Sequence, residues 1–164
     1  MVEDVVRAFG FLTLGSRLKR IGERLQADTQ RIMDDMGVPL QASQYPFLAA
    51  IDRLGPLTIG ELADAVGITQ PGVTRSVAQL VELGLLDAAQ ARNDQRRKVI
   101  SLTKKGKRLV EVARREVWPR IDAAVTDLCG GLSGPLLQQL ASIEDGLAAT
   151  PLSRRRGRAA KAPR

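Results

Sequence analysis

The stretch that decides the fold is LTIGELADAVGITQPGVTRSVAQLVELGLLDAAQARNDQRRKVISL, residues 57–102. Its apolar residues recur at helical spacing on both sides of Gly67, and two short strand-like runs follow Gly84, separated by an arginine-rich segment. This order predicts helix, tight turn, helix and then a two-stranded hairpin. Such an arrangement is typical of a winged helix-turn-helix, which places its second helix in the major groove of DNA.

The first helix of the pair has a clear start and a clear end. Thr58-Ile59-Gly60-Glu61 has the pattern of a capping box, in which the Thr58 hydroxyl and the Glu61 carboxylate satisfy backbone amides at the helix start. Gly67 ends the helix and supplies the tight turn. Its predicted inner face consists of Leu62, Ala63 and Val66.

The second helix is the predicted recognition helix. Thr69 is its expected N-cap and Pro71 falls in its first turn, while Val73, Val77, Leu80 and Val81 are expected to face inward. The outward positions carry short polar side chains and one arginine, which suits close approach to a groove. Gly72 either permits this approach or is merely tolerated near the helix start. The predicted DNA contacts on this helix are Gln70, Pro71, Gly72, Thr74, Arg75, Ser76 and Gln79.

The hairpin is predicted from Leu85 to Gln90 and from Lys98 to Leu102, with residues 92–97 as its loop. Asn93 and Asp94 favour a turn, and the arginines around them would project from its tip. A loop of this composition is often only solvated. Directly after a helix-turn-helix, we interpret it as a wing that reaches phosphates or a minor groove.

Amphipathic helices are expected on both sides of this segment. One spans residues 17–36, and a second runs from Gln41 or Ser43 to Leu54 with Tyr45, Leu48 and Ile51 inward. The first either packs on its own domain or against a second subunit. A long helix capped by Thr103 should be kinked by Pro119, and a last helix capped by Ser133 should follow Gly130-Gly131. Residues 151–164 are predicted to form a disordered basic tail.

The net charge of +7 is unevenly distributed. Residues 151–164 hold six Lys or Arg and no acid, and residues 92–108 hold eight Lys or Arg and one acid. Positive charge gathered in this way indicates phosphate binding, because an ordinary solvated surface interleaves both signs.

Several functional classes are disfavoured by what the sequence lacks. It has no histidine, one cysteine and no glycine-rich phosphate loop, so we expect neither an enzyme, nor a cofactor, nor a metal site. Cys129 is interpreted as a small buried apolar residue rather than a redox sensor. No stretch approaches the roughly 20 apolar residues of a membrane span, and the start lacks signal-peptide features, so a cytoplasmic protein without a membrane partner is expected.

From about Leu12 to Leu147 the chain resembles the MarR family of bacterial transcription regulators. The matching motifs are Glu61-Leu62-Ala63, Thr69 to Arg75, Leu80 to Leu86, the wing residues 93–97 and SLTKKG at residues 101–106. Each motif is weak alone, but their order and spacing are specific. One departure is Asp87, which stands where members often carry a basic residue, so we expect no phosphate contact from that strand.

The resemblance implies a mainly α fold with a small β-hairpin wing, in one domain spanning residues 1–150. The winged helix-turn-helix would span about residues 40–102, and dimerisation helices about 10–36 and 104–148. By position Arg96 would enter the minor groove, Asp94 would brace the turn, and Arg97 or Lys98 would lie near the DNA backbone. The partners implied are a palindromic operator in double-stranded DNA, a second copy of the chain and a small aromatic ligand, whose pocket the sequence does not locate.

The functional prediction is therefore a homodimeric repressor that a small ligand releases from its operator. One alternative is a DNA-binding protein without a ligand switch, to which the basic tail adds general affinity. Another is a free-standing relative of the regulatory half of a regulator/acetyltransferase fusion.

Overall fold

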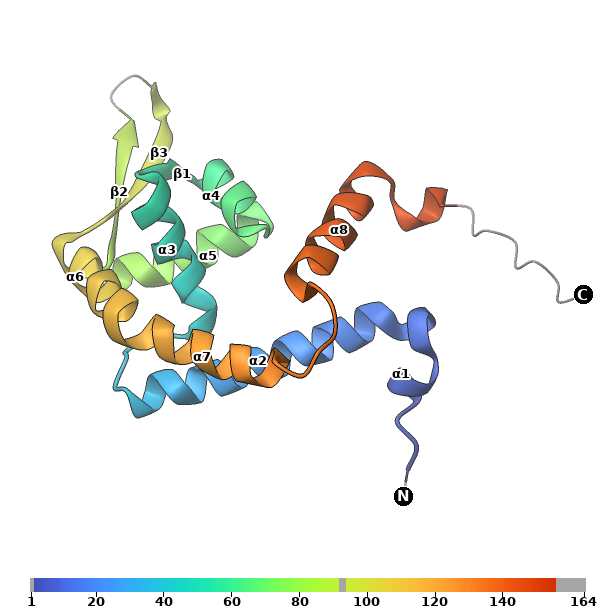
Figure 1. The fold of residues 1–164 in the computed structure, drawn as a ribbon. Coiled ribbons are helices and arrows are strands. Elements are labelled where there is room, and N and C mark those ends of the chain that lie inside the picture. Colours follow the sequence, from blue (N-terminus) through green and yellow to red (C-terminus); the bar gives the residue numbers. More distant parts are fainter. Residues whose placement is uncertain (1, 92–93, 156–164) are drawn as a thin grey trace, which may run out of the picture. The chain divides into compact units, whose positions relative to one another are not determined.

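The structure is a computed structural model that describes residues 2–91 and 94–155, with the backbone alone at residues 91 and 94–97. It is mainly helical with one three-stranded antiparallel sheet, which confirms the predicted fold class (Figure 1). The helices and strands are α1 (Val5–Ala8), α2 (Leu14–Asp35), α3 (Tyr45–Leu54), β1 (Leu57–Thr58), α4 (Ile59–Val66), α5 (Gln70–Glu82), β2 (Leu86–Ala91), β3 (Asp94–Leu102), α6 (Lys104–Val112), α7 (Trp118–Cys129) and α8 (Leu136–Ala149).

The chain divides into two compact units, Met1–Ala123 and Ala124–Arg164. The hydrophobic core lies in the first unit, and we call residues 40–117, which supply almost all of it, the winged body. None of the described helices is both long and apolar enough to cross a membrane. The largest fully buried side chains are Met33, Leu48, Leu62, Val73, Leu80, Leu86, Ile100, Val110 and Val117.

The helix-turn-helix forms as its local signals predict. At the start of α4 the Thr58 backbone N–H donates to the Glu61 carboxylate at 2.8 Å, and the Glu61 N–H donates to the Thr58 hydroxyl at 3.3 Å. Gly67 takes the left-handed conformation at φ 72°, which glycine adopts without the steric cost that a Cβ brings. Thr69 is the N-cap of α5, although its hydroxyl makes no capping hydrogen bond.

The sheet has the order β1-β3-β2, with Leu57 opposite Ile100 and Leu86 opposite Leu102. The second strand of the hairpin begins at Asp94 rather than at the predicted Lys98. The prediction was wrong because a strand needs only backbone partners, and exposed charged side chains do not prevent this pairing. The register shifts between Gln90 and Ala91, so that Ala91 lies opposite Asp94. Residues 92 and 93 lie outside the described residues.

A close approach joins the wing to α6. The Thr103 hydroxyl accepts from the Gly106 N–H at 3.0 Å, as the predicted cap requires, and donates to the Gly84 carbonyl at 2.7 Å. A Cβ built on Gly106 would lie 2.1 Å from the Leu85 carbonyl oxygen. The SLTKKG motif therefore ends in glycine because a backbone carbonyl fills the space of a side chain.

The long helix is interrupted close to Pro119, as predicted, and two other helix predictions need correction. The long helix is interrupted by a π-helical turn at Ala113–Val117, just before Pro119, whose ring conflicts with regular i→i−4 bonding to residue 115. The last helix begins at Leu136 with Pro135 as N-cap, not at Ser133, because Gly134 has a positive φ of 85°. Val81, predicted to face inward, is exposed on the edge of α5.

The segment predicted as a disordered tail begins with structure. Leu152–Arg154 forms a 3-10 turn, and the Arg155 side chain donates to the Thr150 carbonyl at 2.9 Å. Residues 156–164 lie outside the described residues. At the start of this segment, backbone carbonyls at the end of α8 therefore accept hydrogen bonds from an arginine.

Candidate nucleic-acid interface

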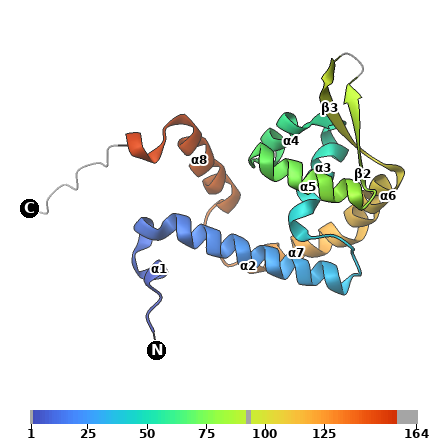
Figure 2. The ribbon, with the colours of Figure 1, turned by 180° about the vertical axis from the view of Figure 1, so that it is seen from behind.

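The recognition helix α5 is anchored along one side and open along the other. Val73, Val77 and Leu80 are buried and hold it against the core of the winged body. In Figure 2 the helix runs across the near face of that body. Of the residues predicted to contact DNA, Gln70, Pro71, Thr74, Arg75 and Gln79 are exposed, and Gly72 and Ser76 are half-buried.

The polar side chains on this open side differ in how they are engaged. The Thr74 hydroxyl donates to the Gln70 carbonyl at 2.9 Å, so it retains acceptor capacity. The Gln79 carboxamide accepts a hydrogen bond from Gln44 at 3.1 Å. No hydrogen bond or ion pair from another described residue engages Arg75, whose guanidinium is therefore available to an external acceptor.

Gly72 is not required by the packing of the protein itself. A Cβ built there would meet the Thr69 hydroxyl at 3.4 Å and an Ile68 methyl at 3.5 Å, which are ordinary contacts. Alanine would fit and would stabilise the helix by about 1 kcal/mol. Two explanations of Gly72 therefore remain: a ligand approaches the backbone closely at this position, or glycine is merely tolerated near the helix start.

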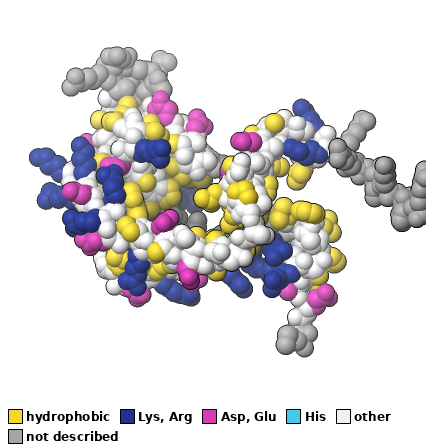
Figure 3. Space-filling view, viewed as in Figure 1, with side chains coloured by type: hydrophobic (Ala, Val, Ile, Leu, Met, Phe, Trp, Pro, Cys, Tyr) yellow, Lys and Arg dark blue, Asp and Glu magenta, His cyan; other side chains and the backbone are white. Residues whose placement is uncertain are grey.

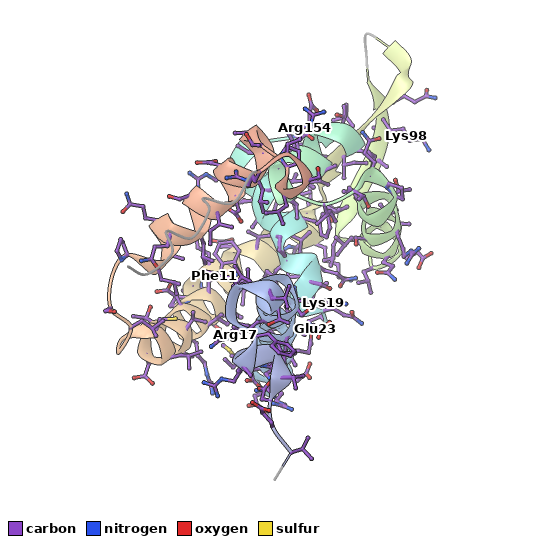
Figure 4. The ribbon with its side chains drawn as sticks, turned by 90° about the vertical axis from the view of Figure 1, so that its right-hand side faces the viewer. Phe11, Arg17, Lys19, Glu23, Lys98 and Arg154 are labelled. Carbon is purple, nitrogen blue, oxygen red and sulfur yellow. The ribbon has the colours of Figure 1, made fainter. Side chains whose placement is uncertain are left out.

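The wing supplies a second group of predicted contacts. Lys98 is exposed on β3, and Figure 4 shows it on the hairpin. Asp94, Arg96 and Arg97 have their backbones in β3, but their side chains lie outside the described part of the molecule. The roles expected for them therefore stay predictions.

Exposed cations on α6 were missing from the predicted contacts. Lys104, Lys105, Lys107 and Arg108 are exposed, and Figure 3 shows Lys and Arg side chains gathered over this helix. The Lys105 ammonium donates to the Leu83 carbonyl at 2.8 Å and so covers the C-terminal end of α5. The sequence showed the run of positive charge that ends at Arg108. It did not show that part of this run lies at the C-terminal end of α5.

A cavity of about 380 Å³ lies between α2, α3 and α7. The Tyr45 and Trp118 rings meet edge to face in its wall, with centroids 6.2 Å apart. The Tyr45 hydroxyl is buried without a hydrogen-bond partner among the described atoms, and burial raises the pKa of this phenol above its usual value. The Tyr45 ring thus forms part of a mostly apolar wall, whereas its hydroxyl is covered by protein atoms. The lining residues are Thr29, Met33, Ala42, Tyr45, Pro46, Ala49, Trp118, Ile121 and Asp122.

A metal centre finds no support in the described residues, where no group of three or more His, Cys, Asp or Glu side chains could hold an ion. Cys129 is half-buried near the end of α7.

Comparison with known proteins places these features in a family. The model of the MarR family matches residues 36–97. The HTH-type transcriptional regulator FarR of Neisseria gonorrhoeae is 31% identical over 129 residues, which cover 76% of this chain and 86% of FarR. These relatives are transcriptional regulators and not enzymes.

Solved structures agree in fold. The transcriptional regulator MOSR of Mycobacterium tuberculosis, in complex with DNA, superposes with a TM-score of 0.70 at 24% identity, covering 84% of this chain and 97% of MOSR. The transcriptional repressor CouR, bound to a 23-mer DNA duplex, gives a TM-score of 0.66 at 26% identity, covering 85% of this chain and 96% of CouR.

Proposed function

The chain belongs to the MarR family of transcriptional regulators, and from that premise we propose that it acts as a homodimeric repressor of transcription. It binds a palindromic operator in double-stranded DNA and leaves it when a small aromatic ligand binds. The observation that carries the proposal is the open side of α5, where an arginine without a partner in the described structure stands among short polar side chains. A relative of similar fold, CouR, is a repressor bound to a DNA duplex.

In the DNA complex, α5 enters the major groove and the wing reaches the adjacent minor groove. Arg75 contacts a base edge or a phosphate, and Arg96 is the arginine of the wing that enters the minor groove. Lys98 and Arg97 neutralise phosphates beside it, so affinity falls steeply as the salt concentration rises.

The homodimer is supported by apolar side chains that one chain leaves exposed. Phe11, in the 3-10 turn before α2, is 93% exposed (Figure 4), and Leu18 and Ile21 on α2 are exposed as well. An isolated soluble chain rarely exposes apolar stripes of this kind without a partner. A second copy would cover them and set the spacing of two α5 helices. α7 and α8 also expose apolar side chains that a second copy would cover, namely Val125, Leu128, Ile143 and Leu147.

The release step is assigned to the cavity beside Tyr45. It joins α2, a proposed dimerisation helix, to α3 of the winged body, so an occupant that favours one angle between them shifts the DNA-binding equilibrium. Its apolar walls, which include the Tyr45 and Trp118 rings, suit an aromatic ring. Replacing Trp118 with Ala removes part of this wall, so a ligand recognised in this way should release the variant from DNA less readily than the native protein.

The proposal is tested by selecting an operator from random DNA and titrating it in gel-shift experiments. Arg75→Ala and Arg96→Ala are each expected to weaken operator binding by about 1–3 kcal/mol, roughly five- to 150-fold. The matched control is Arg115→Ala, because Arg115 is exposed and already pairs with Glu116. If Arg75→Ala and Arg96→Ala both bind the operator like the native protein, the assignment of the DNA-binding site is wrong.

The dimer is tested separately by sedimentation of the full chain, which should have twice the chain mass. Deleting residues 151–164 tests the alternative without a switch. Loss of sequence-specific binding would favour that alternative, whereas a change confined to nonspecific DNA would favour the regulator.

A further inference from the structure

A pair of glutamines links the recognition helix to the segment in front of α3. Gln44 ends the 3-10 turn Ala42–Gln44 and is 6% exposed. Its Nε2 donates to Oε1 of Gln79 on α5 at 3.1 Å, across 35 positions of sequence. Burying a carboxamide costs free energy unless its polar groups are hydrogen-bonded, so this hydrogen bond contributes to the stability of the fold.

The direction of this hydrogen bond follows from the backbone. The oxygen and nitrogen of a carboxamide are hard to tell apart by shape, and must be assigned from their partners. Here the Gln41 backbone N–H, which can only donate, points at Oε1 of Gln44 at 3.1 Å. The NH₂ group of Gln44 must then face Gln79, and Gln79 must turn its oxygen inward to accept.

The segment that carries Gln44 is itself held by α2. Gln30 on α2 accepts from the Ala42 N–H at 2.7 Å and donates to the Leu40 carbonyl at 3.1 Å. The Gln44 N–H donates to the Gln41 carbonyl at 2.9 Å. Gln44 is therefore fixed from behind and does not follow Gln79 if that side chain rotates.

We infer that Gln44 is a positioning residue that makes Gln79 present its NH₂ group, and not its oxygen, to DNA. This inference rests on the proposed function, because it assumes that the open side of α5 meets base edges. A free glutamine recognises adenine by accepting from N6 while it donates to N7. Gln79 held by Gln44 instead offers donors, which match the N7 and O6 acceptors of guanine or the O4 acceptor of thymine, and repel the N4 donor of cytosine.

The test measures base preference with the full chain. Operators are selected from random duplexes, and every position of the selected site is then changed to each other base and titrated. Native protein should prefer guanine or thymine at the Gln79 position of each half-site, by roughly five-fold or more over cytosine and adenine. Gln44→Met should relax this preference at that position alone, with adenine gaining most, because Gln79 can then turn both its groups to the base.

A double-mutant cycle separates this role from a general structural one. Gln79→Met should remove the preference at the same position, and adding Gln44→Met to it should change base preference no further. Gln138→Met, at an exposed glutamine of α8, is the matched control and should leave every position unchanged. A Gln44→Met variant that weakens all positions equally, or effects of the two substitutions that add, would overturn the inference.

A second measurement needs no change at the buried position. The side-chain NH₂ of Gln44 should exchange slowly with solvent in nitrogen-15 NMR spectra of the native protein, and faster in Gln79→Met. Equal exchange in both would show that Gln79 is not its partner and would also overturn the inference. If selection from random DNA enriches no sequence at all, the proposed function fails. If an operator is enriched but its base preference is the same in Gln44→Met, only the inference about Gln44 is overturned.

Discussion

The winged body and the helices α2, α7 and α8, which we call the outer helices, use the same kind of apolar pattern with opposite results. In α3, α4 and α5 the stripe is buried, as Leu48, Leu62 and Leu80 show. In α7 and α8, as far as the structure describes them, no side chain is buried, and in α2 Met33 alone is. The difference teaches that helical periodicity decides where a helix forms, whereas burial depends on what the stripe meets. The stripes of the winged body meet their own core, whereas those of the outer helices stay exposed in one chain, and we propose that a second copy covers them.

The largest expected effect lies inside the winged body. Leu48 is 0% exposed, so Leu48→Ala should lower the free energy of unfolding by about 2–5 kcal/mol through lost burial and the cavity it leaves. Chemical denaturation measures this. Leu54→Ala, on the same helix but 59% exposed, is the matched control and should have a much smaller effect. Equal losses at the two positions would contradict the division between core and surface.

A second, smaller loss is expected where the wing joins α6. Gly106→Ala places a methyl group against the Leu85 carbonyl and should cost about 1–3 kcal/mol through overpacking. The control is Gly15→Ala in α2, where a Cβ meets nothing within 4 Å. That substitution should stabilise its helix by about 0.5–1 kcal/mol. Thermal unfolding should therefore shift in opposite directions, and a shift in the same direction would refute the close approach.

At Gly72 the expected change is a gain in stability of about 1 kcal/mol, because alanine fits and favours the helix. Operator binding tells apart the two interpretations of this glycine. Gly72→Ala should weaken binding in gel-shift titration if the α5 backbone lies close to DNA. Unchanged binding by a more stable protein would favour simple tolerance instead.

The smallest effect on the winged body is expected from the outer helices. Leu147→Glu on α8 should dissociate the proposed dimer in sedimentation experiments, because a charge then enters an exposed apolar stripe that we propose a second copy covers. Hydrogen exchange of amides in α4 and α5 should change by less than about 0.5 kcal/mol. Gln139→Glu is the matched control on the same helix. A dimer that survives Leu147→Glu would mean that α8 lies outside the interface.

Much of the site could be predicted because its signals are local. The capping box joins residues three apart, Gly67 needs a backbone angle of its own, and the stripe of Val73, Val77 and Leu80 follows from helical geometry. These features depend on neighbours in sequence, so the sequence alone determined the helix-turn-helix, the presence of a wing hairpin after it and the side of α5 that stays open.

The tertiary structure decided what depends on residues far apart in sequence. Helical periodicity predicted that Val81 faces inward. The buried stripe of α5 is narrower than predicted, and Val81 is exposed. The contact of Gln44 with Gln79 and the cavity around Tyr45 required α2, α3, α5 and α7 to be packed together first. Sequence spacing fixes the partners within one helix; the partner of a side chain on another helix is fixed by how the chain packs.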